Sequence, residues 1–346
     1  MTMEVRRLQP GSFDAWDDYV NRHEQGTFYH LSGWQEVIDS TYAHPCYFSY
    51  VVEDDKITAV LPLVQVKSKL FGNTLISTPF CIQGGILADH SSAYQLLVEH
   101  AKSLAKQLEV SYVEFRSEAD KSLALGLVCP KEQLSVVFGC ELASQPAKIL
   151  ANVKKKQRAV IRQSLNNNLR YQIEDDVTNL YKIYSYSVRN LGTPVFSKRL
   201  FQRLLAVFPT QCEILTVFHE EKPVSSVMSF YYKGKVLPHF GGGVHDARAL
   251  KSNDYMYYQL MCHGAQKGCD YFDFGRSKVD SGAYNYKKHW GMQASPAGNH
   301  YYLNLAKDTP SLNVNNPKYA LAIKLWKKLP LPVSQLLGPQ LSKYLG

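Results

Sequence analysis

The feature that most constrains the fold is a passage of strand ends, turns and glycines that occurs twice, in the same order. Residues 51–56 resemble 217–222, residues 84–86 resemble 242–244, and residues 112–117 resemble 271–277. The members of these pairs are 158 to 166 residues apart. A near-constant offset predicts a duplicated α/β domain. The alternative is chance similarity between short strand-turn segments.

Hydrophobic spacing gives the two copies a similar expected order of elements. The first copy is predicted to contain helices near 13–21, 32–42 and 92–108 and strands near 46–52, 57–66 and 110–115. The second is predicted to contain helices near 178–190, 197–207 and 253–267 and strands near 213–218, 224–232, 235–240 and 271–274. The expected fold class is therefore α/β (α+β), with the α/β domain present twice.

The same elements divide the 346 residues into four expected parts. These are an N-terminal domain (1–143), a basic linker helix (144–168), a C-terminal domain (169–310) and a basic amphipathic tail (311–346). The linker helix is either a solvated connection or a basic arm over a cleft. The tail either lies in a membrane interface or packs against the domain.

Charge is unevenly distributed along the chain. Residues 1–150 contain 12 Lys and Arg against 18 Asp and Glu, whereas residues 151–346 contain 27 against 12. The second part is therefore expected to meet phosphate, nucleic acid or an anionic membrane surface. No window holds 18 apolar residues and the N-terminus lacks an apolar segment, so we expect a cytoplasmic protein, with peripheral contact at the inner face of the membrane through 317–346 as an option.

Several chemistries are not indicated. The seven cysteines are scattered without a Cys-x-x-Cys motif, which is typical of reduced thiols rather than of disulfides or zinc. Neither Gly-x-Ser-x-Gly nor His-Glu-x-x-His occurs, so no covalent nucleophile and no metal are expected. No helix-turn-helix, zinc-finger or RNP signature supports a nucleic-acid-binding regulator.

The densest group of basic and aromatic residues follows the strand at 271–274. Fixed cations after a strand end and a glycine are suited to holding an anionic group. We expect substrate or phosphate to be bound by Arg276, Lys278, Tyr284 and Lys288 of this group, by Lys155, Arg158 and Arg162 of the linker, and by Arg248. The alternatives are an ion pair of Arg276 with Asp273 or Asp280 and a solvated loop around Arg248.

Residues 273–278 and 282–291 resemble the closing motif of FemAB-like transferases. Residues 188–196 resemble more narrowly the FemAB-like proteins linked to exosortase/PEP-CTERM sorting and exopolysaccharide loci. The resemblance implies two tandem GNAT-like domains, each a mixed β-sheet flanked by helices. It also implies an activity, because Fem enzymes move an amino acid from aminoacyl-tRNA to an amine of a peptidoglycan precursor, and other relatives use acyl-CoA.

The resemblance places Lys287 at the lysine of the aromatic-Lys-x-x-aromatic-Gly motif. It implies that Lys287 stabilises an oxyanion or binds donor phosphate, with a surface lysine as the alternative. Asp273 is a candidate general base, and the alternative is a hydrogen bond to the backbone or a pair with an arginine. The segment 246–253 lacks the Gln/Arg-x-x-Gly-x-Gly/Ala loop of acyl-CoA users, which argues against CoA.

Three functions follow from these observations. The first is transfer of an acyl or aminoacyl group to an amine of a cell-envelope, exopolysaccharide or PEP-CTERM-pathway precursor. The second is CoA-dependent N-acyl transfer, and the third is a non-catalytic binding protein of an exopolysaccharide assembly complex. No permanently bound cofactor is expected, since the donor is aminoacyl-tRNA or acyl-CoA, and contact with tRNA is an expected partner interaction.

Overall fold

The computed structural model describes residues 3–118, 126–130, 135–310 and 317–345. The chain forms two compact units, which are described separately. The N-terminal unit comprises Met1–Leu134, Pro296–Leu312 and Tyr344–Gly346, and the C-terminal unit comprises Ser135–Ser295 and Asn313–Lys343.

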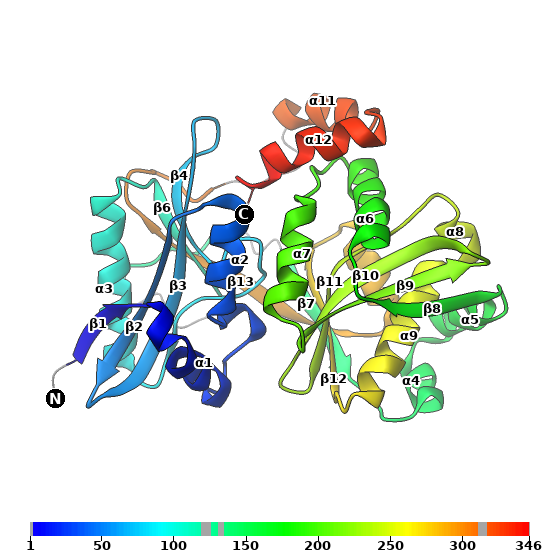
Figure 1. Cartoon of the computed structure of the whole chain (residues 1–346), viewed down its shortest axis with the longest axis horizontal. Helices are drawn as coiled ribbons and strands as arrows, with labels where there is room; N and C mark the ends of the chain where they lie inside the picture. Colours follow the sequence, from blue (N-terminus) through cyan, green and yellow to red (C-terminus); the bar gives the residue numbers. More distant parts are fainter. Residues whose placement is uncertain (1–2, 119–125, 131–134, 311–316, 346) are drawn as a thin grey trace. The chain divides into compact units, whose positions relative to one another are not determined.

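The N-terminal unit is built on one mixed sheet (Figure 1). Its strands, in spatial order, are β1 (Met3–Arg7), β2 (Cys46–Glu53), β3 (Lys56–Ser68), β4 (Gly72–Ser77), β6 (Tyr112–Glu118) and β13 (Gln293–Leu303), with β5 (Leu87–Ala88) beside β3. β4 and β6 are parallel and the other neighbours are antiparallel. The helical elements are η1 (Pro10–Ser12), α1 (Phe13–Arg22), η2 (Phe28–His30), α2 (Gly33–Tyr42) and α3 (Ser91–Gln107).

The helical spacing in α3 gives this unit its core. Leu97, Ala101 and Leu104 recur at intervals of three and four residues, so they share one helix face. They are buried against apolar strand residues that include Leu61 and Val113. Burial of this apolar stripe, rather than helix propensity, fixes α3 on the sheet.

The C-terminal unit repeats this plan. Its strands, in spatial order, are β7 (Ser135–Glu141), β12 (Tyr271–Lys278), β11 (Lys235–Gly243), β10 (Lys222–Tyr232), β9 (Cys212–His219) and β8 (Leu169–Glu174). Its helices are α4 (Pro146–Asn152), α5 (Lys155–Leu165), α6 (Thr178–Leu191), α7 (Lys198–Val207), α8 (Ala247–Leu250), α9 (Ser252–Gln266), α10 (Gly282–Trp290), α11 (Pro317–Trp326) and α12 (Leu331–Ser342).

The two units share one order of elements. The succession β1-α1-α2-β2-β3-β4-α3-β6 returns as β8-α6-α7-β9-β10-β11-α9-β12, with the small helix α8 inserted. In both units the single parallel pair, β4–β6 or β11–β12, occupies the same place. The predicted α/β fold with a duplicated domain is therefore confirmed.

Two helices of the C-terminal unit cover opposite faces of its sheet. A Cβ atom at Gly241 would meet Tyr257 of α9, whereas one at Gly242 would meet Ser187 of α6. Successive residues of a strand point to opposite faces. α9 therefore lies on one face and α6 on the other, and these glycines make room for them.

The compact units do not end at the expected domain boundaries of 143 and 310. Residues 135–143 belong to the C-terminal unit because β7 pairs with β12. Residues 296–310 belong to the N-terminal unit because β13 pairs with β6. β7 and β13 are therefore additional strands, which are not part of the order of elements that the two units share.

The single linker helix expected at 144–168 is two helices, α4 and α5. The chain is extended at Val153 and Lys154, where α4 ends and α5 begins. Ile149 of α4 and Ile161 of α5 are buried in the core of the C-terminal unit, and α5 contacts α9. The segment is thus a packed part of that unit, because its apolar residues have a core to enter.

The tail forms α11 and α12, which belong to the C-terminal unit. Ser342 Oγ donates a hydrogen bond of 3.0 Å to the carbonyl of Val195. None of the helices among the described residues has the length and apolar character needed to cross a bilayer.

Candidate functional site

The motif helix α10 begins and ends at residues suited to those positions. Ser281 Oγ accepts the backbone N–H of Tyr284 at 3.1 Å, which caps the helix at its start. Gly291 has φ +87° and ends it, as glycine does at the C-terminus of many helices. This short helix follows β12 directly and contacts it.

Lys287 of α10 reaches the backbone of β12. Its Nζ donates hydrogen bonds to the carbonyls of Gly275 (3.0 Å) and Arg276 (3.1 Å) and lies 5.2 Å from the centre of the Phe274 ring. Burial lowers the pKa of the ammonium to about 8, while the Asp273 carboxylate acts in the opposite direction. An ammonium has three N–H donors, and these two carbonyls are its acceptors in the described part of the chain, so one N–H is left for a ligand.

A bulge in β12 presents those carbonyls. The register with β7 shifts between Asp273 and Gly275, and Gly275 has φ +74°. Asp273 Oδ1 accepts the Gly275 N–H at 2.8 Å, so this carboxylate holds the bulge in shape. This is the backbone bond that was the alternative to a general-base role for Asp273.

The other expected ligands of the motif lie on both elements. Arg276 and Lys278 are on β12, both half-buried. Tyr284 packs its ring against Phe138 of β7 with 5.3 Å between centroids, and Lys288 Nζ lies 5.8 Å above the same ring. Tyr284 is therefore held by core packing, while Lys288 is exposed beside it.

A half-buried carboxylate joins three helices next to this motif. Asp254, in the first turn of α9, accepts hydrogen bonds from Gln157 Nε2 of α5 (2.6 Å) and the Tyr286 hydroxyl of α10 (2.9 Å). Burial raises the pKa of Asp254. Burial and the nearby Asp254 charge raise the pKa of Tyr286 well above its usual value. No sequence pattern pointed to Gln157, and Tyr286 was recognised only as part of the motif at 282–291.

An aromatic cluster forms the floor beneath Lys287. The rings of Tyr257, Phe274, Tyr286 and Trp290 contact one another, with centroids 4.6 to 6.4 Å apart. Burial raises the pKa of Tyr257 to about 12. This aromatic cluster excludes water from one side of Lys287 and packs α10 against β12.

The linker brings basic residues beside α10. Lys154 Nζ donates to the carbonyl of Lys288 at 3.1 Å. Arg158 donates from Nε and Nη2 to the Val153 carbonyl, which fixes the junction of α4 and α5. Two further residues of the prediction, Lys155 and Arg162, are exposed on α5. The structure thus places the linker cations and the motif cations on neighbouring helices.

Arg248 is exposed on α8, near the other end of α5. Asn167, just beyond α5, donates from Nδ2 to the Leu250 carbonyl at 2.9 Å, which links the two helices. α5 therefore extends from α10 to α8, and its exposed cations lie between those of the two other helices.

The glycine run 241–243 does not form a phosphate loop. Gly241–Gly243 end strand β11 and pair with β10. A Cβ atom at Gly243 would approach Ala247 and Asn253 to 2.6 and 2.9 Å, so the glycine permits α8 and α9 to pack closely. The first turn of α9 carries the Asp254 carboxylate, which disfavours a pyrophosphate there.

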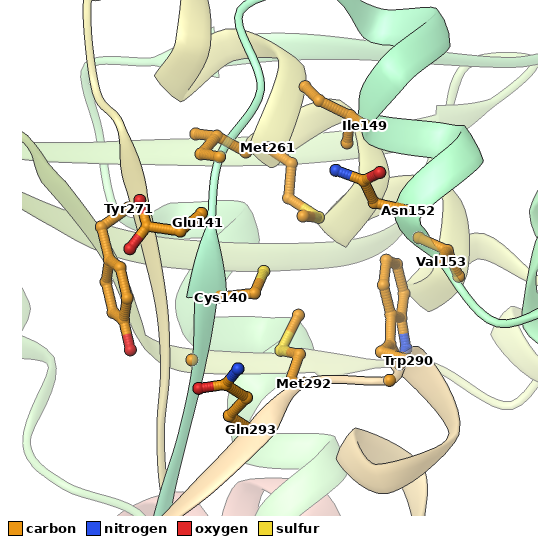
Figure 2. Close-up of a pocket in the computed structure, with 13 residues that line it drawn as sticks. Cys140, Glu141, Ile149, Asn152, Val153, Met261, Tyr271, Trp290, Met292 and Gln293 are labelled. Atoms are coloured by element: carbon orange, nitrogen blue, oxygen red, sulfur yellow. The ribbon is translucent and has the colours of Figure 1, made fainter.

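A cavity of about 250 Å³ lies behind Trp290 (Figure 2). Ile149 and Met261 line it from α4 and α9, and Trp290 and Met292 line it from the end of α10. Polar side chains at its edge are Glu141, Asn152 and Gln293. Neither Lys287 nor Arg276 lines this cavity. No sequence pattern predicts the cavity, because its walls come from five separate segments of the chain.

These observations agree with the comparisons with known proteins. Residues 148–288 match the family described as acetyltransferase (GNAT) domain. This range contains β8 to β12, α9 and Lys287, so the likeness to a GNAT acetyltransferase domain falls on the C-terminal unit. The match supports a transferase.

Solved structures extend the likeness to nearly the whole chain. FemX is 17% identical with a TM-score of 0.69, over 92% of this chain and 100% of that one. L-PGS from Bacillus licheniformis is 14% identical with a TM-score of 0.54, over 96% and 98%. A tandem GNAT protein from the clavulanic acid biosynthesis pathway is 9% identical with a TM-score of 0.56, over 87% and 99%. The chain thus has a FemX-like, tandem GNAT fold. The comparison with curated proteins gave no match.

Proposed function

We propose that this protein transfers an acyl or aminoacyl group from an anionic carrier to an amine. The observation that carries the proposal is Lys287, whose ammonium is held by two backbone carbonyls and keeps one N–H for a ligand. A positively charged donor fixed in advance over an apolar floor suits the oxyanion of acyl transfer.

The reaction balances without a further reagent. The amine nitrogen attacks the donor carbonyl, whose oxygen becomes an oxyanion that accepts the hydrogen bond from Lys287. The C–O or C–S bond to the carrier then breaks as the amide forms. The amine loses a proton, and the departing oxygen or sulfur gains one. With a pKa of about 8, Lys287 is mostly charged at pH 7, as this role requires.

The donor that the site favours is an aminoacyl-tRNA rather than acyl-CoA. Asp254 stands in the first turn of α9, where a CoA pyrophosphate would need positive charge. The exposed cations that we propose for the carrier phosphates are Lys155, Arg162, Arg248 and Lys288. Arg158 would support them from the junction of α4 and α5. Arg276, Lys278 and Tyr284 would contact the group being transferred.

The acceptor that we propose is an amine of a cell-envelope or exopolysaccharide precursor, including precursors of the PEP-CTERM pathway. This part rests on the resemblance of residues 188–196 to FemAB-like proteins. Asp273 is proposed as a positioning residue, because its carboxylate maintains the bulge that presents the two carbonyls to Lys287.

The test compares Lys287→Ala with Lys288→Ala, an exposed neighbour on the same helix. Each variant is expressed in a strain that lacks the wild-type gene, and its surface polymers are analysed by mass spectrometry. Purified proteins are also assayed with labelled aminoacyl-tRNA and with acetyl-CoA. We expect kcat to fall about 100-fold or more for Lys287→Ala. For Lys288→Ala, a proposed ligand of the carrier phosphate, we expect kcat to change less than threefold and the loss to appear as a higher KM for the donor. Full complementation by Lys287→Ala would leave a non-catalytic binding protein as the function.

A further inference from the structure

The final helix, α12, buries its small residues and exposes its large ones. Ser334, Gly338 and Ser342 recur every four residues and are buried. A Cβ atom at Gly338 would approach Val195 to 2.8 Å, and the Ser342 hydroxyl bonds the Val195 carbonyl. The side of α12 that packs on the C-terminal unit is therefore a stripe of small residues.

Leucines occupy the opposite side. Leu336 is 74% exposed and Leu337 is 45% exposed on α12. On α11, Leu321 and Leu325 lie one turn apart and are 66% and 58% exposed. A helix that packs on a soluble protein normally buries such residues, so the arrangement is inverted relative to the expected amphipathic pattern.

Contacts on the inner side hold both helices in this orientation. The Arg189 guanidinium of α6 donates to the Leu329 carbonyl between α11 and α12 at 3.2 Å. A Cβ atom at Gly192 would meet Ile323 of α11 at 2.5 Å, so α11 lies directly on the end of α6. Figure 1 shows α11 and α12 next to each other beside this end of α6. Leu191, the last residue of α6, is itself 69% exposed there.

All the charged residues of this segment are cations. Residues 309–346 contain five lysines and no Asp or Glu. Lys324, Lys327 and Lys328 are exposed between the leucines of α11 and α12. Long lysine stems allow the ammonium groups to reach headgroup phosphates while neighbouring leucines enter the acyl region.

We propose that the leucine and lysine surface of α11 and α12 binds an anionic lipid bilayer. Exposed apolar side chains interspersed with cations, without a carboxylate, match acyl chains and anionic headgroups together. The two alternatives for this tail, packing and membrane contact, are not exclusive: one side packs on the C-terminal unit and the other side is available to lipid. The inference does not depend on the transfer reaction.

The first test is flotation of the full-length protein with vesicles. Phosphatidylcholine vesicles are compared with vesicles that contain about one-third phosphatidylglycerol, at low and high salt. We expect binding to the anionic vesicles that weakens with added salt, and little binding to the neutral ones. Absence of binding to the anionic vesicles at low salt would overturn the proposal.

The second test assigns the binding to this surface. Leu321→Glu is compared with Leu305→Glu, because Leu305 of the N-terminal unit is also 66% exposed. Lys324→Gln with Lys328→Gln is compared with Lys56→Gln and Lys106→Gln, two exposed lysines elsewhere. We expect more than tenfold weaker binding for Leu321→Glu, about 30-fold weaker binding for the tail lysine pair, and unchanged binding for the controls.

A second copy of the chain is the other candidate occupant of the surface. Light scattering on the wild type and on Leu336→Glu decides this alternative, and circular dichroism confirms that the variant is folded. We expect both proteins to have the same mass. A wild-type dimer that Leu336→Glu dissociates, together with equal vesicle binding by both, would overturn the lipid proposal.

Discussion

The Tyr286 hydroxyl donates a 2.9 Å hydrogen bond to Asp254 Oδ1, and this oxygen also accepts Gln157 Nε2 at 2.6 Å. The three residues lie on α10, α9 and α5, and Gln157 is 97 residues from Asp254 in the chain. One half-buried carboxylate therefore fixes the motif helix relative to the linker and to the first turn of α9. The shape of the Lys287 site depends on this arrangement.

The first prediction concerns the pH dependence of stability at Asp254. Burial raises its pKa in the folded state, so the folded protein binds a proton more tightly than the unfolded chain. The stability from protonation is fully present below the unfolded value of about 3.8 and is lost as pH rises through the folded pKa. We expect Asp254→Asn to remove this dependence and to change the free energy of unfolding at pH 7 by about 1 kcal/mol.

Urea unfolding of wild type and Asp254→Asn between pH 4 and pH 8 measures the effect. The difference in unfolding free energy between them is expected to favour the wild type increasingly as pH falls. Asp246→Asn is the matched control, because Asp246 lies just before α8 and its side chain is 74% accessible. A pH-independent difference for Asp254→Asn would contradict the assignment.

The second prediction is the pH profile of transfer. If the Lys287 ammonium stabilises the oxyanion, activity requires its charged form, so the rate falls as pH rises through about 8. Lys287→Arg keeps a positive charge to higher pH and should move this fall upward, with a lower maximal rate because a guanidinium cannot reproduce both carbonyl bonds. The measurement is kcat/KM from pH 6 to 10. A rate that rises through pH 8 would assign Lys287 to proton abstraction instead.

The sequence predicted most of the fold because its signals were local. The apolar spacing in α3 and in α6 depends only on a few neighbouring residues. The same is true of the glycines after strands and of the turns between strands. The strands β1, β4, β7, β8 and β13 were missed. β7 and β13 gain their places from partner strands far away in the chain, β12 and β6. The break at Val153 was missed as well, since the run of lysines after it is compatible with a continuous helix.

The candidate site was predictable in composition but not in contacts. The aromatic-lysine motif identified Lys287, yet nothing local showed that Nζ reaches the carbonyls of Gly275 and Arg276. Tyr286 lies within the motif at 282–291. Its hydrogen bond to Asp254 could not be predicted without knowing where α9 begins. Gln157 had no signal, because a glutamine among lysines is typical of an exposed helix.

The third prediction concerns an ion-pair cluster at the far end of α9. Glu213 Oε2 lies 2.9 Å from His263 Nε2, and Oε1 lies 2.6 Å from Lys267 Nζ. The hydrogen bond from His263, with Lys267 beside it, lowers the pKa of Glu213 to about 2. Because the folded pKa is depressed, this stability is present above the unfolded value of about 4.5 and is lost as pH falls toward 2.

We expect Glu213→Gln to reduce the free energy of unfolding by about 1 to 2 kcal/mol at pH 7 and by much less at pH 3. Thermal and urea unfolding at both pH values measure the change. Glu221→Gln is the matched control, because the Glu221 side chain is 90% accessible in its pair with Arg170 and should contribute little. Equal losses for the two variants would show that burial does not distinguish the pairs.

The last prediction tests the bulge that presents the carbonyls to Lys287. Gly275 has φ +74°, a conformation that costs an alanine about 1 kcal/mol, while a new Cβ would come no nearer than 4.0 Å to Lys287 Nζ. Gly275→Ala should therefore lose about 1 kcal/mol of stability and, by relaxing the bulge, displace both carbonyls.

Gly282→Ala is the control, since nothing lies within 4 Å of its Cβ position. We expect kcat to fall at least tenfold for Gly275→Ala with KM for the donor little changed, and neither constant to change for Gly282→Ala. A Gly275→Ala variant that loses stability but keeps full activity would show that the backbone of β12 does not position Lys287 for the reaction.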